Sequence, residues 1–120
     1  MLRSALLALA ALLATAASAQ VPTPDAFLGY DLGDRFTPHH RVVAYVEAVR
    51  AGAVATSRGE GPPTRPVVWL SYNVHGDEAV STEAAMQTLY DLTQSPDLLA
   101  DVVVVLDPCL NPDGRDRFAD

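Results

Sequence analysis

The chain has 120 residues, which is enough for one small domain and too few for two of ordinary size. It carries 8 basic and 15 acidic residues, a formal net charge of −7, and this balance argues against a nucleic-acid partner and against docking on an anionic membrane. Hydrophobic residues make up 49% of the chain, which predicts a folded domain, and the single cysteine, Cys109, excludes an intrachain disulfide and a cysteine-rich zinc module.

Residues 1–19 have the pattern of a secretory signal peptide. Arg3 precedes an apolar run rich in leucine and alanine, and residues 17–19, Ala-Ser-Ala, form the small-x-small sequence that signal peptidase prefers. The apolar run over residues 5–17 is too short for a membrane span, which needs about 20 residues. We therefore expect cleavage before Gln20, no membrane span and a secreted or periplasmic protein. A buried N-terminal helix is the alternative.

The next segments predict an arm and then a helix. Residues 20–36 contain prolines and glycines without periodicity, so we expect an extended arm. Thr37 suits the N-cap of a helix and Pro38 its first position, and apolar side chains then recur at helical spacing up to Gly52. This stripe consists of His39, Val42, Val43, Val46 and Val49. Residues 59–66 follow as a polar connector rich in proline and glycine.

Two β-prone runs flank a second predicted helix. Residues 66–72 and 102–106 are continuous apolar runs, typical of strands buried on both faces of a sheet. Residues 78–93 predict a helix between them, with Glu83 on its solvated face. Its inward stripe is Thr82, Ala85, Met86, Leu89 and Leu92. The order strand, helix, strand predicts a βαβ unit with parallel strands, and hence an α/β fold.

Parallel strands would bring two polar loops to the same edge of the sheet. Residues 73–78, Asn-Val-His-Gly-Asp-Glu, follow the first predicted strand, and residues 107–117 follow the second. Ligands of open parallel sheets bind beyond the carboxyl ends of the strands. We therefore expect the residues capable of chemistry to lie close together at this edge.

His75 and Glu78, on the first loop, are candidate metal ligands. An imidazole and a carboxylate three residues apart on a short loop can converge on one Zn²⁺ ion, and Gly76 allows the tight bend between them. A hydrolytic zinc site needs three protein ligands and an open position for water, and this spacing offers two. From spacing alone an alternative stays open, in which His75 caps the loop and Glu78 is an acidic residue of the first helical turn.

The second loop offers two arginines as candidate substrate-binding residues. Residues 111–114, Asn-Pro-Asp-Gly, predict a plain type I turn. Arg115 and Arg117 follow at once, and either guanidinium could clamp a substrate carboxylate with two hydrogen bonds. The alternative is that both are solvated charges that balance Asp113 and Asp116.

Taken together, the two loops resemble those of the zinc metallocarboxypeptidases, the carboxypeptidase A-like peptidases. The resemblance covers residues 27 to 120 and is carried by Asn-x-His-Gly-Asp-Glu, a helix, and then Asn-Pro-Asp-Gly-Arg. It implies an α/β/α sandwich around a mostly parallel or mixed sheet, with residues 37–120 as its amino-terminal part. It also implies that His75 and Glu78 are the first two zinc ligands. The implied reaction removes the C-terminal residue from a peptide with a free C-terminus, by a zinc-held water, a general-base glutamate and substrate-binding arginines.

The chain also departs from the pattern of that family. The family's third zinc ligand and its general base lie further downstream and have no counterpart up to Asp120, and its carbonyl-polarising arginine lies later than Arg115 or Arg117. We therefore expect an incomplete α/β/α domain and an inactive fragment of a zinc carboxypeptidase. Two alternatives stay open. One is a zinc amidohydrolase that deacylates N-acyl amino acids, because that family also uses a His-Gly-x-Glu loop. The other is a secreted, non-catalytic binding domain on the same scaffold.

Overall fold

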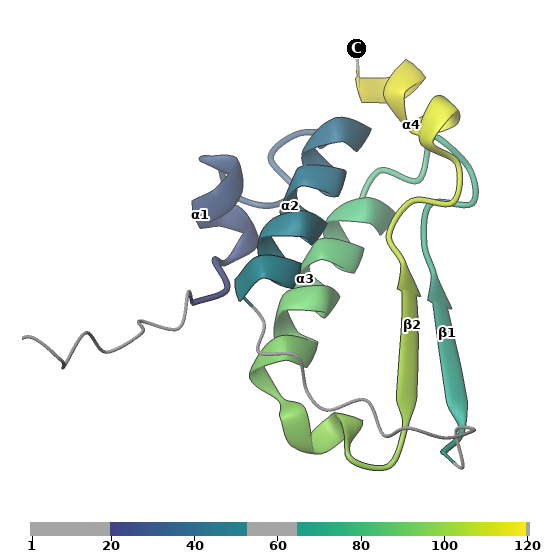
Figure 1. The fold of residues 1–120 in the computed structure, drawn as a ribbon. Helices are drawn as coiled ribbons and strands as arrows, with labels where there is room; N and C mark the ends of the chain where they lie inside the picture. Colours follow the sequence, from purple (N-terminus) through teal and green to yellow (C-terminus); the bar gives the residue numbers. More distant parts are fainter. Residues whose placement is uncertain (1–19, 53–64, 120) are drawn as a thin grey trace, which may run out of the picture.

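The computed structural model describes residues 20–52 and 65–119 (Figure 1). The predicted signal peptide and most of the polar connector at 59–66 lie outside the described residues. The elements in chain order are α1 (Pro24–Leu28), α2 (His39–Gly52), β1 (Val67–Ser71), α3 (Ser81–Gln94), the 3₁₀ helix η1 (Pro96–Leu99), β2 (Val103–Asp107) and α4 (Pro112–Ala119). Within the described ranges, no helix is both long enough and apolar enough to cross a membrane.

The centre of the fold is a βαβ unit. β1 and β2 pair in parallel, in a register that runs from Val67 opposite Val103 to Ser71 opposite Asp107, and α3 connects them (Figure 1). This confirms the α/β class and the parallel pairing that the order of the elements predicts. The strands begin and end within one residue of their expected bounds, whereas α3 begins three residues later than expected, at Ser81.

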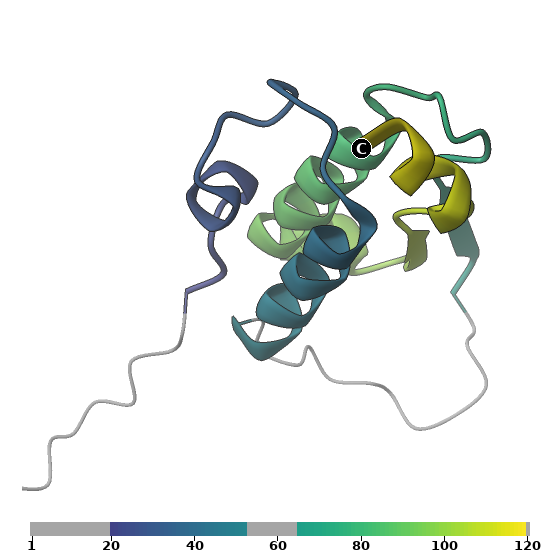
Figure 2. The ribbon, with the colours of Figure 1, turned by 90° about the horizontal axis from the view of Figure 1, so that it is seen from above.

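The hydrophobic core lies among the helices. α1, α2 and α3 lie side by side (Figure 2), all on the same side of the two strands (Figure 1). The buried core residues are Val21, Leu28, Val42, Tyr45, Val49 and Met86. Phe27 of α1 packs edge-on against Tyr45 of α2, with ring centroids 5.3 Å apart, and so joins the short first helix to this core.

One face of the sheet is open among the described residues, contrary to the expectation that both strands are buried on both faces. Val67, Trp69 and Val105 are exposed, with 67% of Trp69 accessible. These residues share a face, because side chains alternate along a strand and Trp69 lies opposite Val105 in the register. The prediction was wrong because a continuous apolar run identifies a strand without showing which elements cover it. The described helices lie on one side of the sheet, and even there Val68 is 42% exposed.

The segment expected to be an extended arm contains α1. The Thr23 hydroxyl accepts a hydrogen bond from the Ala26 amide at 3.3 Å, Pro24 occupies the first helical position, and Gly29 ends the helix with a φ of 80°. Threonine, proline and glycine suit these three positions, but a helix of five residues is too short to show periodicity. The expected extended conformation is therefore wrong for residues 24–28.

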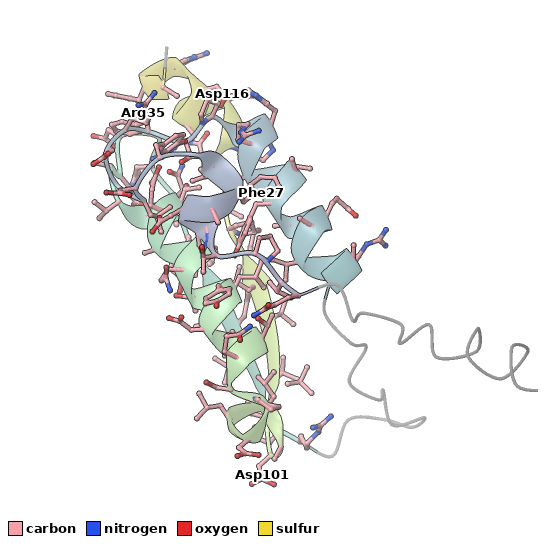
Figure 3. The ribbon with its side chains drawn as sticks, turned by 90° about the vertical axis from the view of Figure 1, so that its left-hand side faces the viewer. Phe27, Arg35, Asp101 and Asp116 are labelled. Carbon is pink, nitrogen blue, oxygen red and sulfur yellow. The ribbon has the colours of Figure 1, made fainter. Side chains whose placement is uncertain are left out.

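The stripe expected on α2 is shifted by the packing. Val42 and Val49 are buried as expected, but Tyr45 is buried in place of Val43, which is exposed. Thr37 is buried, and its hydroxyl pairs with that of Tyr30 at 3.0 Å; it makes no hydrogen bond to an amide of α2, so its side chain does not act as the N-cap. The backbone at the start of α2 is held instead by Asp116 of α4, whose carboxylate accepts from the His39 amide at 2.8 Å. Figure 3 shows Asp116 at one end of the molecule and Asp101, which precedes β2, at the other.

Candidate metal centre

The two polar loops meet at the carboxyl edge of the sheet, as expected. The Leu110 amide donates to the Tyr72 carbonyl at 2.9 Å, and the Asn111 amide donates to the Asn73 carbonyl at 3.1 Å. The Asn111 side chain also donates to the carbonyl of Val74 at 3.3 Å. These hydrogen bonds extend the parallel pairing beyond the strands, so that both loops leave the sheet in contact with each other (Figure 1).

Two glycines bring the loops into close contact. Gly76, in the first loop, is buried against the backbone of Gly114, in the first turn of α4. A Cβ atom on Gly76 would lie 2.6 Å from the Cα of Gly114, closer than real Cβ atoms approach. The glycine that the sequence suggested for a tight bend is therefore needed for this close approach of two backbones.

His75 and Glu78 lie side by side on the first loop. The His75 Nδ1 is 3.1 Å from the Glu78 Oε1, and the other carboxylate oxygen accepts a hydrogen bond from the Val74 amide at 3.1 Å. Desolvation raises the pKa of Glu78, but hydrogen bonds from His75 and Ser81 outweigh it and hold this pKa below its usual value. The carboxyl group is therefore ionised at neutral pH and already faces the imidazole nitrogen.

The chemistry of this donor pair fits zinc. Imidazole nitrogen and carboxylate oxygen are both ligands of Zn²⁺, and the side chains are open to solvent, with 77% of His75 and 35% of Glu78 accessible. Within residues 20–52 and 65–119, no group of three or more histidine, cysteine, aspartate or glutamate side chains is placed to hold a metal ion. The described part of the chain thus places His75 and Glu78 side by side, and their role as metal ligands stays a prediction.

Cys109 lies on the second loop but is a poor metal donor here. Its side chain is buried, and burial raises the pKa of the thiol above its ordinary value in spite of a hydrogen bond with Thr82 and the nearby charge of Arg115. Because the thiolate is the form that binds metal, this environment keeps the cysteine protonated and inert.

Asn73 is a residue of this edge that the sequence analysis missed. It is buried, and its φ of 55° lies in the left-handed region, which asparagine tolerates better than most residues. Its amide donates to the Ser81 hydroxyl at 2.7 Å, and its side-chain oxygen accepts from the Thr82 hydroxyl at 3.0 Å. Asn73 thus turns the chain out of β1 and fastens the first loop to α3. An asparagine directly after an apolar strand is the signal that identifies such a turn.

The Asn-Pro-Asp-Gly segment begins α4, so the expectation of a plain turn was wrong. The Asn111 side-chain oxygen accepts a hydrogen bond from the Gly114 amide at 2.9 Å, which makes Asn111 the N-cap, and Pro112 is the first residue of the helix. A type I turn and the first turn of a helix have similar backbone angles, and the same residues favour both. What distinguishes them is the run of residues after Pro112 that continues the helix to Ala119.

The two candidate arginines lie in opposite environments. Arg115 is fully buried, whereas Arg117 is exposed. Arg115 forms a buried ion pair with Glu83 of α3 and donates to the carbonyls of Thr37, Glu78 and Ala79. The alternative in which Arg115 is a solvated charge is therefore wrong, and its guanidinium does not face the solvent from which a substrate would approach.

Glu83, the partner of Arg115, was expected on the solvated face of its helix, and this prediction was wrong. Its side chain is buried, and Oε1 accepts from both the Thr37 amide, at 2.7 Å, and the Arg115 guanidinium. Helical periodicity places Glu83 next to Thr82, at the border of the inward stripe, and charge alone suggested that it faces solvent. The residue that compensates its charge is 32 positions away along the sequence, so a local pattern does not reveal the pair.

The site and fold together define an α/β protein in which a loop at the carboxyl edge of a parallel sheet brings His75 and Glu78 together. The model of the zinc carboxypeptidase family matches residues 45–120, which is more than half of the chain and includes both loops. The chain therefore belongs to the zinc carboxypeptidase family, whose members are zinc-dependent peptidases. The match begins within α2, later than residue 27, where the sequence resemblance begins. No curated protein and no solved structure matches the chain.

Proposed function

We propose that the chain carries two of the zinc ligands, His75 and Glu78, of a carboxypeptidase that removes the C-terminal residue from peptides. The observation that carries this proposal is the 3.1 Å separation of the His75 Nδ1 and the Glu78 Oε1, in a loop that packs against the Asn-Pro-Asp-Gly segment. Membership of the zinc carboxypeptidase family supports the same reading. A bound zinc ion would supply Lewis-acid chemistry, acidifying a water and polarising the scissile carbonyl.

The side chains of His75 and Glu78 are already held in place in the structure without a metal ion. The Val74 amide holds one carboxylate oxygen of Glu78, and the other oxygen already faces the imidazole of His75. Preorganisation of this kind lowers the entropic cost of binding, because fewer side-chain rotations are lost when the ligand arrives. Both donors are reached directly from solvent.

We propose that Arg117 binds the C-terminal carboxylate of the peptide substrate. Of the two arginines that follow the second loop, Arg117 is the exposed one, and a guanidinium binds a carboxylate through two parallel hydrogen bonds. We expect the chain to bind a short peptide with a free C-terminus more tightly than the same peptide with an amidated C-terminus. Arg117→Gln should abolish this difference, as measured by NMR titration. An equal preference in both proteins would overturn the assignment.

Zinc binding by the full chain tests the central part of the proposal. The wild-type chain should bind about one zinc ion, measured by competition with a chromogenic chelator. His75→Ala and Glu78→Gln should each weaken binding by roughly tenfold or more, because each removes a direct ligand. His40→Ala is the matched control, since His40 is exposed on α2 and outside the site. The same zinc affinity in all four proteins would contradict the assignment.

Export is also part of the proposal, on the evidence of residues 1–19 alone. The basic start, the apolar run and the Ala-Ser-Ala sequence predict cleavage by signal peptidase. Intact-mass measurement of the chain recovered from outside a bacterial cytoplasm should therefore give a product that begins at Gln20. A product that retains Met1 and stays inside the cell would show that these residues do not act as a signal.

A further inference from the structure

The buried guanidinium of Arg115 contacts the same loop that carries the metal donors. Its Nη1 donates to the carbonyls of Glu78, at 3.3 Å, and of Ala79, at 3.4 Å. Its Nε donates to the carbonyl of Thr37 at 3.3 Å, and its Nη2 forms the ion pair with Glu83. One side chain of α4 thus binds three parts of the chain: the loop that carries His75 and Glu78, here called the metal loop, the segment before α2, and α3.

The surroundings of Arg115 hold its guanidinium in one place. The group lies over the ring of Phe36, 4.3 Å from the ring centroid, and Glu83 compensates its charge. Glu83 is itself held by the Thr37 amide. A planar fork with five donors can bond to several acceptors at fixed angles at once, which the ammonium group of a lysine cannot reproduce.

From these contacts we propose that Arg115, held by Glu83, is a positioning residue that places the His75–Glu78 donor pair. The two carbonyls it binds belong to Glu78 and to the residue after it, so the guanidinium fixes the backbone from which one donor extends. Side chains that orient metal ligands commonly contribute about one to two orders of magnitude to metal affinity. This role differs from contact with substrate, because Arg115 is buried. The inference rests on the proposed zinc site.

The positioning role can also be measured without metal, by hydrogen exchange of the Val74 amide. The Val74 amide donates to the Glu78 Oε2 at 3.1 Å in an exposed part of the loop, so hydrogen exchange at Val74 measures how firmly the carboxylate is placed. If Arg115 positions Glu78, then loosening the guanidinium contacts speeds exchange at Val74. The guanidinium reaches this loop at the carbonyls of Glu78 and Ala79, so its effect on Val74 passes through the Glu78 backbone.

The experiment compares the full-length chain with Arg115→Lys, which keeps a positive charge beside Glu83 but loses the fork. The expected result is a melt that stays cooperative at a lower temperature, exchange at Val74 about tenfold faster, and zinc affinity about tenfold or more weaker. Arg50→Lys is the matched control, because Arg50 forms an exposed pair with Glu47 at 2.9 Å, outside the metal loop. This control should leave both measurements as in the wild type.

A second variant covers the case in which Arg115→Lys fails to fold. Arg115→Met combined with Glu83→Gln removes both buried charges together, and such paired replacements are often tolerated. The side-chain amide introduced by Glu83→Gln would still offer an oxygen to the Thr37 amide, while the bonds from Arg115 to the metal loop are lost. This variant should show the same fast exchange at Val74 and the same loss of zinc affinity.

The outcomes separate this inference from the proposed function. Wild-type exchange at Val74 and wild-type zinc affinity in both folded variants would overturn the positioning role and leave the zinc site standing. Faster exchange at Val74 in a chain that binds no zinc in any form would support positioning of the loop and overturn the proposed function. Loss of exchange protection and of zinc affinity together supports both.

Discussion

At the scale of the residue, Tyr45 shows how burial couples the helical core to pH. Its side chain is fully buried, and the hydroxyl donates to the Pro22 carbonyl at 3.1 Å. Burial first, and then the neighbouring Tyr90 and Asp91, raise the pKa of Tyr45 to about 12 from an ordinary value of 10.0. The folded state therefore favours the neutral phenol, and ionising it requires either unfolding or the burial of a charge.

This predicts a loss of stability in alkaline solution. Between about pH 10 and 12 the unfolded chain loses the Tyr45 proton while the folded chain keeps it, so the free energy of unfolding falls as pH rises. The loss should reach on the order of 2 kcal/mol. Urea unfolding as a function of pH measures it, with Tyr45→Phe as the control that lacks this titration. Equal alkaline slopes in both proteins would contradict the shifted pKa.

A second prediction at this scale concerns the buried ion pair. Arg115→Met alone leaves Glu83 charged and buried, which should lower the free energy of unfolding by about 3–5 kcal/mol. Adding Glu83→Gln to this variant should recover part of the loss. The measurement is equilibrium unfolding of the two single variants and the double variant. A double variant whose loss equals the sum of the single losses would mean that the two side chains do not interact in solution.

Residues of the site differ in how far sequence predicts them. His75 and Glu78 are predictable because they lie three positions apart on one short loop. The buried pair of Glu83 and Arg115 is not, because its members come from different helices and meet only after both pack against the segment at Thr37. A charged residue at the border of an apolar stripe is equally consistent with exposure and with burial beside a distant partner.

At the scale of the element, loop contacts decide how the site is assembled. Gly76 lies against Gly114, and Asn111 both caps α4 and donates to the carbonyl of Val74. The start of α4 therefore supports the loop at residues 73–78 through a helix cap and a close approach of two backbones. A change at either glycine has to move one element relative to the other.

Gly76→Ala tests this contact. The added Cβ would collide with the Gly114 backbone, so the loop or α4 must shift, and we expect a loss of about 1–3 kcal/mol in the free energy of unfolding. Asp77→Ala, at the exposed neighbouring position, should change stability little. Thermal or urea unfolding of the two variants is the measurement. Equal stability of Gly76→Ala and the wild type would show that the loops are further apart than the structure has them.

Sequence predicted β1, α3 and β2 but missed the short helices α1 and α4. β1, α3 and β2 follow from apolar runs and a helical stripe, and each lies within three residues of its expected bounds. α1 has five residues and α4 has eight, so periodicity has too few turns to show. Their caps were present in the sequence as Thr-Pro and Asn-Pro, and capping chemistry rather than periodicity is the signal for such helices.

At the scale of the whole molecule, the described helices lie against one face of the sheet and leave the other open (Figure 1). Trp69, the single tryptophan of the chain, lies on the open face. We expect its fluorescence in the native chain to be quenched by iodide almost as strongly as in urea, because most of the side chain is accessible. Strong protection from iodide in the native monomer would contradict an open face. Sequence could not predict the exposure of Trp69, because the apolar run at residues 66–72 is typical of a strand that is buried on both faces.

The central claim is that the carboxyl edge of this sheet holds zinc through His75 and Glu78. The chain has three histidines, and ¹⁵N NMR resolves their ring nitrogens during titration with Zn²⁺. The account predicts that zinc shifts the His75 Nδ1, the nitrogen that faces Glu78, and leaves His39 and His40 unchanged. A response confined to His39 or His40, or no response at His75 at saturating zinc, would contradict it.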